Sequence, residues 1–477
     1  MLLAVIVSSL LIISATVAKQ SVEVVIFIRE GPETDMVKAA AEYWNKHYAA
    51  KEGIVVKYAV FGRPGYFEKI TTTLLARSPD YDIMWVLCNE IGRFAAAGVL
   101  EPLDKYVSSK ELYPYGLKAF FPASLDSCRY KGKLYALPSV ISTFHLYYRK
   151  DLINKLLTDK AWKAKFSEIA SKIKADLGKM LEEVPEEVKP GIRWLIEHIK
   201  TEPVSPDKWT WSDFLVTAAF FTKSHNPGSP TEYGTTIMGK RGECPPKEWY
   251  MFLWSFGGDF FKHGTYIPTL NSSAAKQALT FWASLLRRWH VVPPDVDTYE
   301  YPEVLEALRS GKVAFSLQWD AAYPDLTSKE KSPLVWDKIA ITYVPIGPNG
   351  RHHFIHTWTF VLNAASLKKE AAFKVLAWLT SSKEGGIFAA KYCGPIPRSD
   401  IMLSEEILKM RPDWKLMANE IAKYGHAEAV MPEWPKIHDI ICIHLVNALA
   451  GVEDPVKACN AMNSEIYALL KSAGYYG

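Results

Sequence analysis

Apolar and polar residues alternate between strand-like and helix-like spacing in the first part of the chain. Short apolar runs at Val22–Ile28, Ile54–Phe61 and Asp82–Leu87 predict three buried β-strands. Between these runs, residues 35–48 and 66–76 carry apolar side chains at intervals of three and four, which predicts amphipathic helices. Strands that alternate with helices in this way favour parallel βαβ units, and therefore an α/β fold.

Polar residues directly follow each of these predicted strands. They are Glu30 after the first strand, Arg63 after the second, and Asn89 and Glu90 after the third. In open α/β sheets, ligands bind outside the carboxyl ends of the strands. We therefore expect these four side chains to lie at a ligand-binding edge of the sheet.

A longer extended stretch runs from Gly132 to Lys150. Its β-branched and aromatic residues, which favour extended chain, are Tyr135, Val140, Ile141, Thr143, Phe144, Tyr147 and Tyr148. Pro138 removes a backbone donor inside this run, which confines that point to a strand edge or to a break between two strands. An extended segment with a built-in break suits a crossover between two lobes.

This stretch also carries a family resemblance. The sequence GKLYALPSVISTFHLYYRKDL resembles the G-K-x-Y-G-x-P…L-x-Y-N-K-D-L signature of extracellular solute-binding proteins of ABC importers, family 1, which includes maltose-binding protein. It departs from that signature at Ala136, where the family has Gly, and at Arg149, where the family has Asn. In the family this segment is the first hinge strand and lines the ligand cleft, which implies a ligand contact at Ser142.

Further blocks follow in the family's order from about Val22 to Leu470. Examples are SPDYDIMWVLCNEIGRFAAAGVLEPLDKYV at residues 78–107, LEALRSGKVAFSLQWDAAY at residues 305–323, and the segment Tyr392–Ser399 with its two prolines. The resemblance implies an α/β, two-lobed periplasmic-binding-protein type II fold with three inter-lobe crossovers, the third of them at residues 392–399.

These crossovers divide the chain into two lobes of non-contiguous sequence. We expect residues 20–137 and 346–394 in lobe 1, and residues 138–345 and 395–477 in lobe 2. Residues 151–206 form a Lys-, Glu-, Ala- and Leu-rich helical insert that is longer than the connection usual in the family. Its charges are typical of a solvated helical face, and a cover over the cleft or a partner contact is the alternative.

The resemblance also implies ligand contacts in two of these blocks. The strand in the block of residues 305–323 ends at the cleft in the family, which makes Trp319, Asp320 and Tyr323 candidates. The family pair that aligns with Asn89 and Glu90 often holds sugar hydroxyls.

Aromatic residues supply the remaining candidates. His356 and Trp358 stand where the family has Gly-Gly-Trp, whose aromatic ring often stacks on the ligand. Trp254 lies in an aromatic helix, for which a buried core position is the equal alternative. Trp434 lies near the closing block, where sugar-binding members place an aromatic residue in the cleft.

The amino terminus has the character of an export signal. Residues 1–18 carry no charged side chain and are followed by the polar residues Lys19, Gln20 and Ser21. This length suits a signal peptide or an uncleaved N-terminal membrane anchor, and a buried first strand is the weaker alternative. We expect the protein on the extracellular side of the cytoplasmic membrane, either secreted or anchored.

Composition limits the choice of partners. The 477 residues carry a formal net charge of +4 with both signs interspersed, which argues against nucleic acid as a partner. The 16 Trp and 24 Tyr mostly fill large cores, but aromatic rings also bind the apolar faces of sugars and cations. We expect a monomer that binds carbohydrate and docks on ABC transporter permease subunits.

Two motifs suggest a metal site and a phosphate loop, but their sequence context supports neither. His352, His353 and His356 suggest a metal site, but their Gly- and Pro-rich flanks exclude a single helical face and no nearby Cys or Glu completes a ligand set. Residues 234–241 match a phosphate loop but end in Arg instead of Ser or Thr. We predict no metal, no nucleotide and no other cofactor. The six cysteines have no metal-binding spacing, and both disulfides and free thiols stay open.

The sequence therefore predicts a non-catalytic receptor that captures a mono- or oligosaccharide between two lobes and closes on it. One alternative is the same fold binding a non-sugar solute, namely glycerol phosphate, a polyamine or iron. Additional Arg or Lys residues in the cleft would favour glycerol phosphate. Additional Asp or Glu residues would favour a polyamine, and a pair of Tyr residues would favour iron. The weaker alternative is a secreted glycoside hydrolase, for which no paired carboxylate motif is found.

Overall fold

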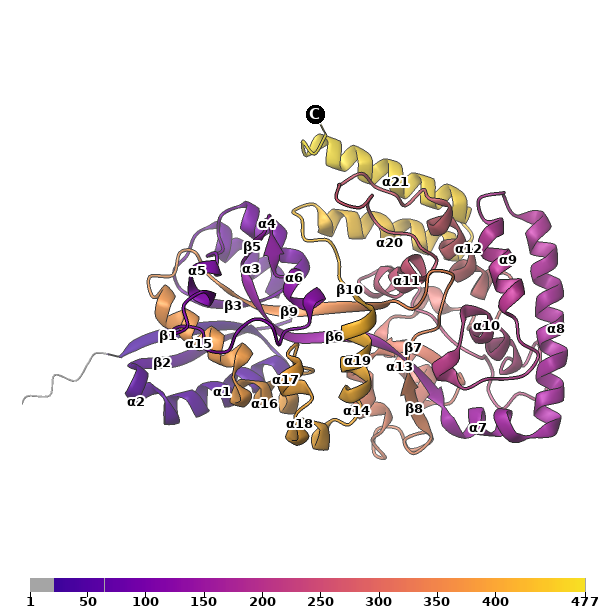
Figure 1. Cartoon of the computed structure of the whole chain (residues 1–477), viewed down its shortest axis with the longest axis horizontal. Helices are drawn as coiled ribbons and strands as arrows, with labels where there is room; N and C mark the ends of the chain where they lie inside the picture. Colours follow the sequence, from indigo (N-terminus) through magenta and orange to yellow (C-terminus); the bar gives the residue numbers. More distant parts are fainter. Residues whose placement is uncertain (1–20, 64, 477) are drawn as a thin grey trace, which may run out of the picture.

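The computed structural model describes residues 21–63 and 65–476, which form two lobes connected by extended chain (Figure 1). The predicted signal peptide or anchor at residues 1–18 lies outside the described residues. Each lobe has its own hydrophobic core. None of the helices in the described ranges is long and apolar enough to cross a membrane.

The three predicted N-terminal strands are confirmed and form one edge of the sheet in lobe 1. They are β1 (Val22–Arg29), β2 (Ile54–Phe61) and β3 (Ile83–Leu87), and β1 pairs in parallel with both of the others. The helices between them are α1 (Pro32–His47) and α3 (Tyr66–Leu75). The sheet order β2-β1-β3-β9-β6-β7 then continues from lobe 1 into lobe 2.

Two long antiparallel strands connect the lobes. They are β6 (Ala136–Arg149) and β9 (His353–Leu362), and each contributes residues to both cores. In Figure 1 they run side by side through the waist of the molecule. Pro138 marks a register shift between β6 and β9 instead of separating two strands, so the predicted break is a local irregularity within one crossover strand.

The third crossover lies later in the chain than expected. The segment 392–399 stays with lobe 1, because Ile141 N donates to Pro395 O at 2.9 Å and Phe121 N donates to Pro397 O at 3.0 Å. Residues of α19 (Trp414–Tyr424) are also buried in the first core. The chain passes β10 (Gly425–His426) and enters the second core at Met431.

The lobe boundaries that we expected therefore shift. Residues 395–424, expected in lobe 2, pack with lobe 1, because the apolar faces of their helices complete its core. Residues 346–354, expected in lobe 1, lie with lobe 2, where Ile346 N donates to Trp209 O at 2.8 Å and Phe354 joins the core. The remaining elements of lobe 1 are α2 (Ala49–Glu52), α4 (Ile91–Ala96), α5 (Asp104–Val107), α6 (Pro122–Asp126), β4 (Arg129–Tyr130), β5 (Lys133–Leu134), α15 (Lys369–Ser381), α16 (Lys383–Tyr392), α17 (Ser399–Met402) and α18 (Glu405–Met410).

Lobe 2 packs helices around the far halves of the crossover strands. Strands β7 (Phe315–Trp319) and β8 (Ile339–Thr342) both pair with β6. Its other helices are α10 (Trp211–Phe220), α11 (Cys244–Ser255), α12 (Ser273–Arg287), α13 (Tyr301–Arg309), α14 (Tyr323–Leu326), α20 (Trp434–Ala450) and α21 (Pro455–Ser472). The N-cap of α10 is Thr210, whose hydroxyl accepts from Asp213 N in a capping box.

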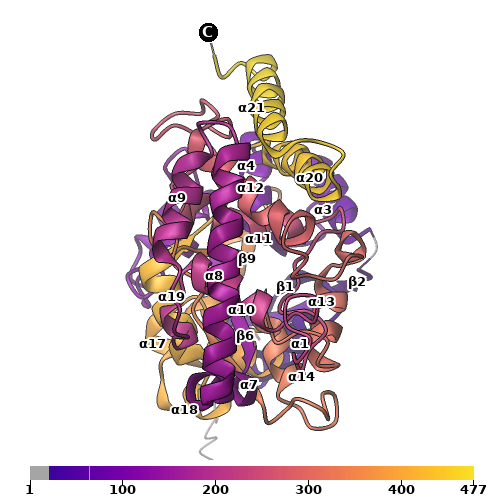
Figure 2. The same cartoon turned by 90° about the vertical axis from the view of Figure 1, so that its right-hand side faces the viewer.

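The predicted insert is helical and belongs to lobe 2. It forms α7 (Lys150–Thr158), α8 (Lys160–Glu183) and α9 (Lys189–His198), and Phe166 of α8 is buried in the second core. Figures 1 and 2 place α8 along the outer end of lobe 2, on the side away from lobe 1. Within the described part of the chain, the insert contributes no residue to the inter-lobe cavity, so it does not cover the ligand cleft.

Candidate ligand-binding site

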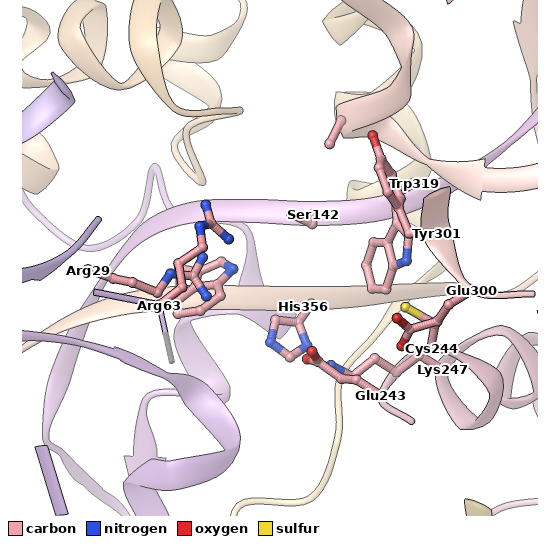
Figure 3. Close-up of a pocket in the computed structure, with 12 residues that line it drawn as sticks. Arg29, Arg63, Ser142, Glu243, Cys244, Lys247, Glu300, Tyr301, Trp319 and His356 are labelled. Carbon is pink, nitrogen blue, oxygen red and sulfur yellow. The ribbon is translucent and has the colours of Figure 1, made fainter. Parts of the chain in front are cut away.

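A cavity of about 300 Å³ lies between the two lobes, against the crossover strands (Figure 3). This volume is at the lower end of the range of ligand pockets. Three groups of residues line it: Arg29, Arg63 and Trp358 from lobe 1; Ser142 and His356 from the floor; and Glu243, Cys244, Lys247, Glu300, Tyr301, Trp319 and Ala321 from lobe 2. We call these groups the lobe 1 wall, the floor and the lobe 2 wall.

The floor consists of facing residues on the two crossover strands. Ser142 of β6 pairs with His356 of β9, so their side chains point to the same face of the sheet. Burial and the nearby Lys247 ammonium lower the pKa of His356 to about 4. The imidazole is therefore neutral at pH 7 and can donate one hydrogen bond and accept another.

The lobe 1 wall combines an indole ring with two guanidinium groups. Trp358 stacks on the buried Trp85 with ring centroids 3.9 Å apart, and the guanidinium carbon of Arg29 lies 4.6 Å from the Trp358 centroid. Glu33 sits behind the wall and is almost fully buried. Its Oε1 accepts from Arg29 Nε at 2.5 Å and lies 3.5 Å from a terminal nitrogen of Arg63. These contacts hold the Trp358 ring and Arg29 in place, whereas the Arg63 side chain is 52% exposed.

The lobe 2 wall is formed by the ends of three elements. Trp319 ends β7, and its ring packs against Phe144 with centroids 4.1 Å apart. Glu300 and Tyr301 lie at the start of α13, and Glu243 and Cys244 at the start of α11. This wall therefore offers an aromatic ring together with hydrogen-bond donors and acceptors.

A buried charge network lies beneath the lobe 2 wall and the floor. Burial disfavours the charged form of Lys247, but the Glu243 and Glu428 carboxylates outweigh the effect of burial and raise the pKa of Lys247. Glu428 comes from the third crossover and is also buried. Burial opposes its charge, but Lys247 and His438 lower the pKa of Glu428 to about 2. Glu428 Oε2 lies 4.0 Å from His356 Nδ1, so this carboxylate connects the third crossover to the floor.

The structure places some of the sequence candidates in the lining and others outside it. Residues predicted from the sequence that line the cavity are Arg63, Ser142, Trp319, His356 and Trp358. Residues predicted from the sequence that lie outside the lining are Glu30, Asn89, Glu90, Trp254, Asp320, Tyr323 and Trp434.

Packing explains why three of these candidates lie elsewhere. Asp320 is buried and accepts from Thr143 N at 3.0 Å, which ties the end of β7 to the crossover strand β6. Trp434 is fully buried and contacts the Phe260 ring at 4.9 Å, so it is a core residue. Trp254 is buried as well, and thus the core alternative for this residue is correct.

The other candidates outside the lining are polar or half-exposed. Asn89 donates to Glu428 Oε2 at 3.2 Å and so supports the network beneath the floor. Glu90 contacts Arg93 on the following helical turn. Glu30 is exposed, and Tyr323 is half-buried. Arg29, the residue before Glu30, lines the cavity instead, because successive side chains of a strand point to opposite faces.

Sequence analysis missed Arg29 and most of the lobe 2 wall. For α11 a signal was present: Pro245 and Pro246 occupy its first turn, where proline is favoured. From the sequence we considered only the aromatic part of this helix around Trp254, which left Glu243 and Lys247 out of the candidate set. No comparable signal marks Glu300 and Tyr301, because only the packing of α13 against β7 brings them to the cavity.

The histidine motif does not converge on one point in the structure. His353 and His356 are three positions apart on β9, so their side chains point to opposite faces of the strand. Among residues 21–63 and 65–476, no group of three or more His, Cys, Asp or Glu side chains is arranged to hold a metal ion. All six cysteines are free thiols, which resolves the alternative that the sequence left open.

Comparison with known proteins identifies the family. Residues 30–386, more than half of the chain, match the model of the bacterial extracellular solute-binding protein family. The chain belongs to this family. Its members are solute-binding proteins, so the chain is a binding protein and not an enzyme.

Solved structures and curated relatives agree with this assignment. Maltose-bound MalE3 of T. maritima has a TM-score of 0.70 at 21% identity and covers 94% of this chain and 100% of its own. A mannitol-binding protein of Pseudomonas aeruginosa is 23% identical over 70% of this chain. A putative binding protein of Brucella abortus is 24% identical over 93% of this chain and 91% of its own length.

Other relatives match over a smaller part of their length. The chain spans 64% of the mannitol-binding protein and 62% of a probable amino-acid ABC transporter periplasmic-binding protein of Sinorhizobium fredii, to which it is 25% identical. The structural likeness shows the two-lobed α/β binding-protein fold that we expected.

Proposed function

We propose that this protein is the extracellular receptor of an ABC importer and that it captures a mono- or oligosaccharide, or a related polyol, between its lobes. It then delivers the solute to the permease subunits on the outer face of the cytoplasmic membrane. The family assignment supports the role in solute binding, and the proposal of a carbohydrate comes from the cavity. A crystal structure of a relative from Agrobacterium vitis contains bound D-mannitol, and one from T. maritima contains maltose.

The observation that carries the carbohydrate proposal is the pairing of aromatic rings with polar groups on opposing walls. Trp319 comes from lobe 2 and Trp358 from the lobe 1 half of β9. Aromatic rings pack on the C–H faces of sugars, while side chains such as Ser142, Lys247 and Glu300 can bind hydroxyls. Each such hydrogen bond contributes about 1 kcal/mol, so several are needed for micromolar affinity.

The same arrangement explains how binding is signalled. A solute that contacts both walls stabilises the form in which they are close together, and the lobes then close about β6, β9 and the chain after α19. Closure follows only if the ligand binds the closed form better than the open one. The closed form is the one that docks productively on the permease.

The cavity also bears on the non-sugar alternatives. Arg29 and Arg63 line it on the lobe 1 wall, and this favours glycerol phosphate over a polyamine. Iron binding by a pair of tyrosines finds no support in the described residues, because Tyr301 is the one tyrosine in the lining. Glycerol phosphate is therefore the second candidate.

A ligand panel tests the proposal directly. Thermal unfolding is followed with mono-, di- and oligosaccharides, polyols, polyamines and glycerol phosphate. A ligand that binds only the folded protein, at 100 times its dissociation constant, adds about 2.7 kcal/mol of stability. Stabilisation by one sugar or polyol class is the expected result. If no sugar and no polyol raises the unfolding temperature, a carbohydrate ligand is refuted.

Substitution of Trp319 then locates the site. We expect Trp319→Ala to weaken the binding of the identified sugar about tenfold or more in calorimetric titration, because a stacked ring contributes roughly 1–2 kcal/mol. Trp336→Ala is the matched control, since Trp336 is 37% exposed and lies outside the cavity lining. Equal sugar affinity of wild type and Trp319→Ala would exclude the proposed site.

A further inference from the structure

We propose that the solute is a sugar or polyol with a single anionic group, a carboxylate or a phosphate, which binds Arg29 and Arg63 on the lobe 1 wall. This inference rests on the proposed function and adds the charge and the orientation of the ligand. In Figure 3 the two arginines lie at one end of the cavity, opposite Trp319, Tyr301 and the charged residues of lobe 2.

The lobe 1 wall carries an uncompensated positive charge. Arg29 and Arg63 share one carboxylate, because both contact Oε1 of Glu33. One carboxylate opposite two guanidinium groups leaves one net positive charge. Arg29 uses its Nε to bind Glu33, and this leaves its two terminal nitrogens for a ligand. The guanidinium group is thus held in the orientation that binds carboxylate or phosphate through two hydrogen bonds.

This wall also offers donors without acceptors. Arginine and the indole of tryptophan donate hydrogen bonds but do not accept them. Within the described residues, the side chains of the lobe 1 wall are Arg29, Arg63 and Trp358, and none of them is an acceptor. A hydroxyl placed against them would leave its own proton without a side-chain partner. A carboxylate or phosphate only accepts, so it satisfies a donor-only wall completely.

The lobe 2 wall has the opposite character. Glu243 and Glu300 accept hydrogen bonds, Lys247 donates, and Tyr301 does both. The Lys247 ammonium already pairs with Glu243 and is 1% exposed, so it offers little charge to a second anion. The carboxylates of this wall would repel one. Sugar hydroxyls therefore face lobe 2, and the single acidic group faces lobe 1.

Matched ligands test the inference on the full chain. Calorimetry compares glucose, glucuronate and glucose 6-phosphate, and the same three forms of galactose, at low and at moderate salt. Binding of an acidic form at least about tenfold tighter than its neutral parent is the expected result, with a salt dependence that the neutral sugar lacks. The uronate and phosphate arms show which anion is recognised.

Arginine variants place the anion. Arg63→Gln is the first choice because the Arg63 side chain is 52% exposed, so the variant is expected to fold. It should lose most of the preference for the acidic form while binding of the neutral parent changes little. Arg77→Gln, at an exposed position of lobe 1 outside the lining, is the control and should keep the preference.

The outcomes separate this inference from the proposed function. Neutral sugars that bind as tightly as their acidic forms would overturn the anionic ligand and leave the sugar receptor intact. A preference for the acidic form that survives unchanged in Arg63→Gln would overturn the placement of the anion at Arg63. Binding of none of the sugars, neutral or acidic, would overturn both.

Discussion

Two histidines on the crossover strands are buried beside one carboxylate, and burial changes the pKa of one of them. His353 of β9 is fully buried, and its Nε2 lies 3.8 Å from Glu420 Oε1 of α19. His145 of β6 contacts the same carboxylate, with Nδ1 at 2.8 Å from Oε2. Burial lowers the pKa of His353 to about 4, although Glu420 opposes this effect. His353 is thus neutral in the folded protein over the physiological range.

This shift predicts a loss of stability in acid. Because the pKa of His353 is lower when folded than its ordinary value near 6.5, the unfolded chain binds more protons between pH 6.5 and pH 4. Its contribution to stability is complete above pH 6.5 and is lost as the pH falls toward 4. The unfolding free energy of wild type falls between pH 7 and pH 5. We expect it to fall by on the order of 1–2 kcal/mol less in His353→Phe.

Urea unfolding at the two pH values measures this difference. His263→Gln serves as the control because His263 is exposed, and its pH dependence should equal that of wild type. If His353→Phe loses as much stability as wild type between pH 7 and pH 5, then the burial of His353 does not cause the acid sensitivity.

At the scale of elements, the insert is a structural part of lobe 2. Its helix α8 buries an apolar stripe that includes Phe166, Ile173 and Leu177, and Asp176 on the same helix accepts from Arg288 Nε at 2.7 Å. The charged residues that mark the insert in the sequence lie on its outer face. The sequence shows this amphipathic pattern, but the partner of the apolar stripe is known only from the fold.

Removal of a core side chain from α8 should affect stability and not binding. We expect Phe166→Ala to lower the unfolding free energy by roughly 3–5 kcal/mol, the usual cost of a large cavity in a core. Solute affinity should stay within twofold of wild type, because the described cavity lining contains no residue of the insert. Denaturant unfolding and calorimetry on the same samples measure the two quantities.

Lys174→Ala on the same helix is the matched control, since Lys174 is exposed and its replacement should leave both quantities unchanged. A solute affinity that falls in Phe166→Ala at temperatures where the variant is folded would show that the insert contributes to the cleft.

At the scale of the whole molecule, the two lobes are separate packing units that three crossovers connect. The two walls of the cavity belong to different hydrophobic cores, and β6, β9 and the chain from α19 to Met431 connect them. Two separate cores allow each lobe to move as a unit, with the backbone changes confined to the crossovers.

We therefore expect the radius of gyration in small-angle X-ray scattering to decrease when saturating solute is added, because the lobes close on it. Trp319→Ala at the same solute concentration should contract less, since fewer of its molecules are liganded. An unchanged radius at a concentration that calorimetry shows to be saturating would contradict closure by the ligand.

The position of the third crossover shows a limit of prediction at this scale. Prolines in the segment Tyr392–Ser399 suggested that the chain leaves lobe 1 there. The chain stays, because Ile407 and Trp414 complete the first core before the crossover at residues 425–431. A proline-rich extended segment has the same local signature at a lobe edge as between lobes, and only long-range packing distinguishes the two.

Local periodicity in the sequence predicted strands β1, β2 and β3, the helices α1 and α3 between them, and the extended stretch that forms β6. The two-lobed α/β fold followed from the resemblance to the family. The resemblance also implied Ser142, Trp319, His356 and Trp358, and the end of the second predicted strand implied Arg63; all five line the cavity. Only the tertiary structure decided that Trp434 is a core residue and that Arg29, rather than Glu30, faces the cavity. The reason is physical: the direction of a side chain depends on strand register and on which lobe packs against it, and both are set by residues distant in sequence.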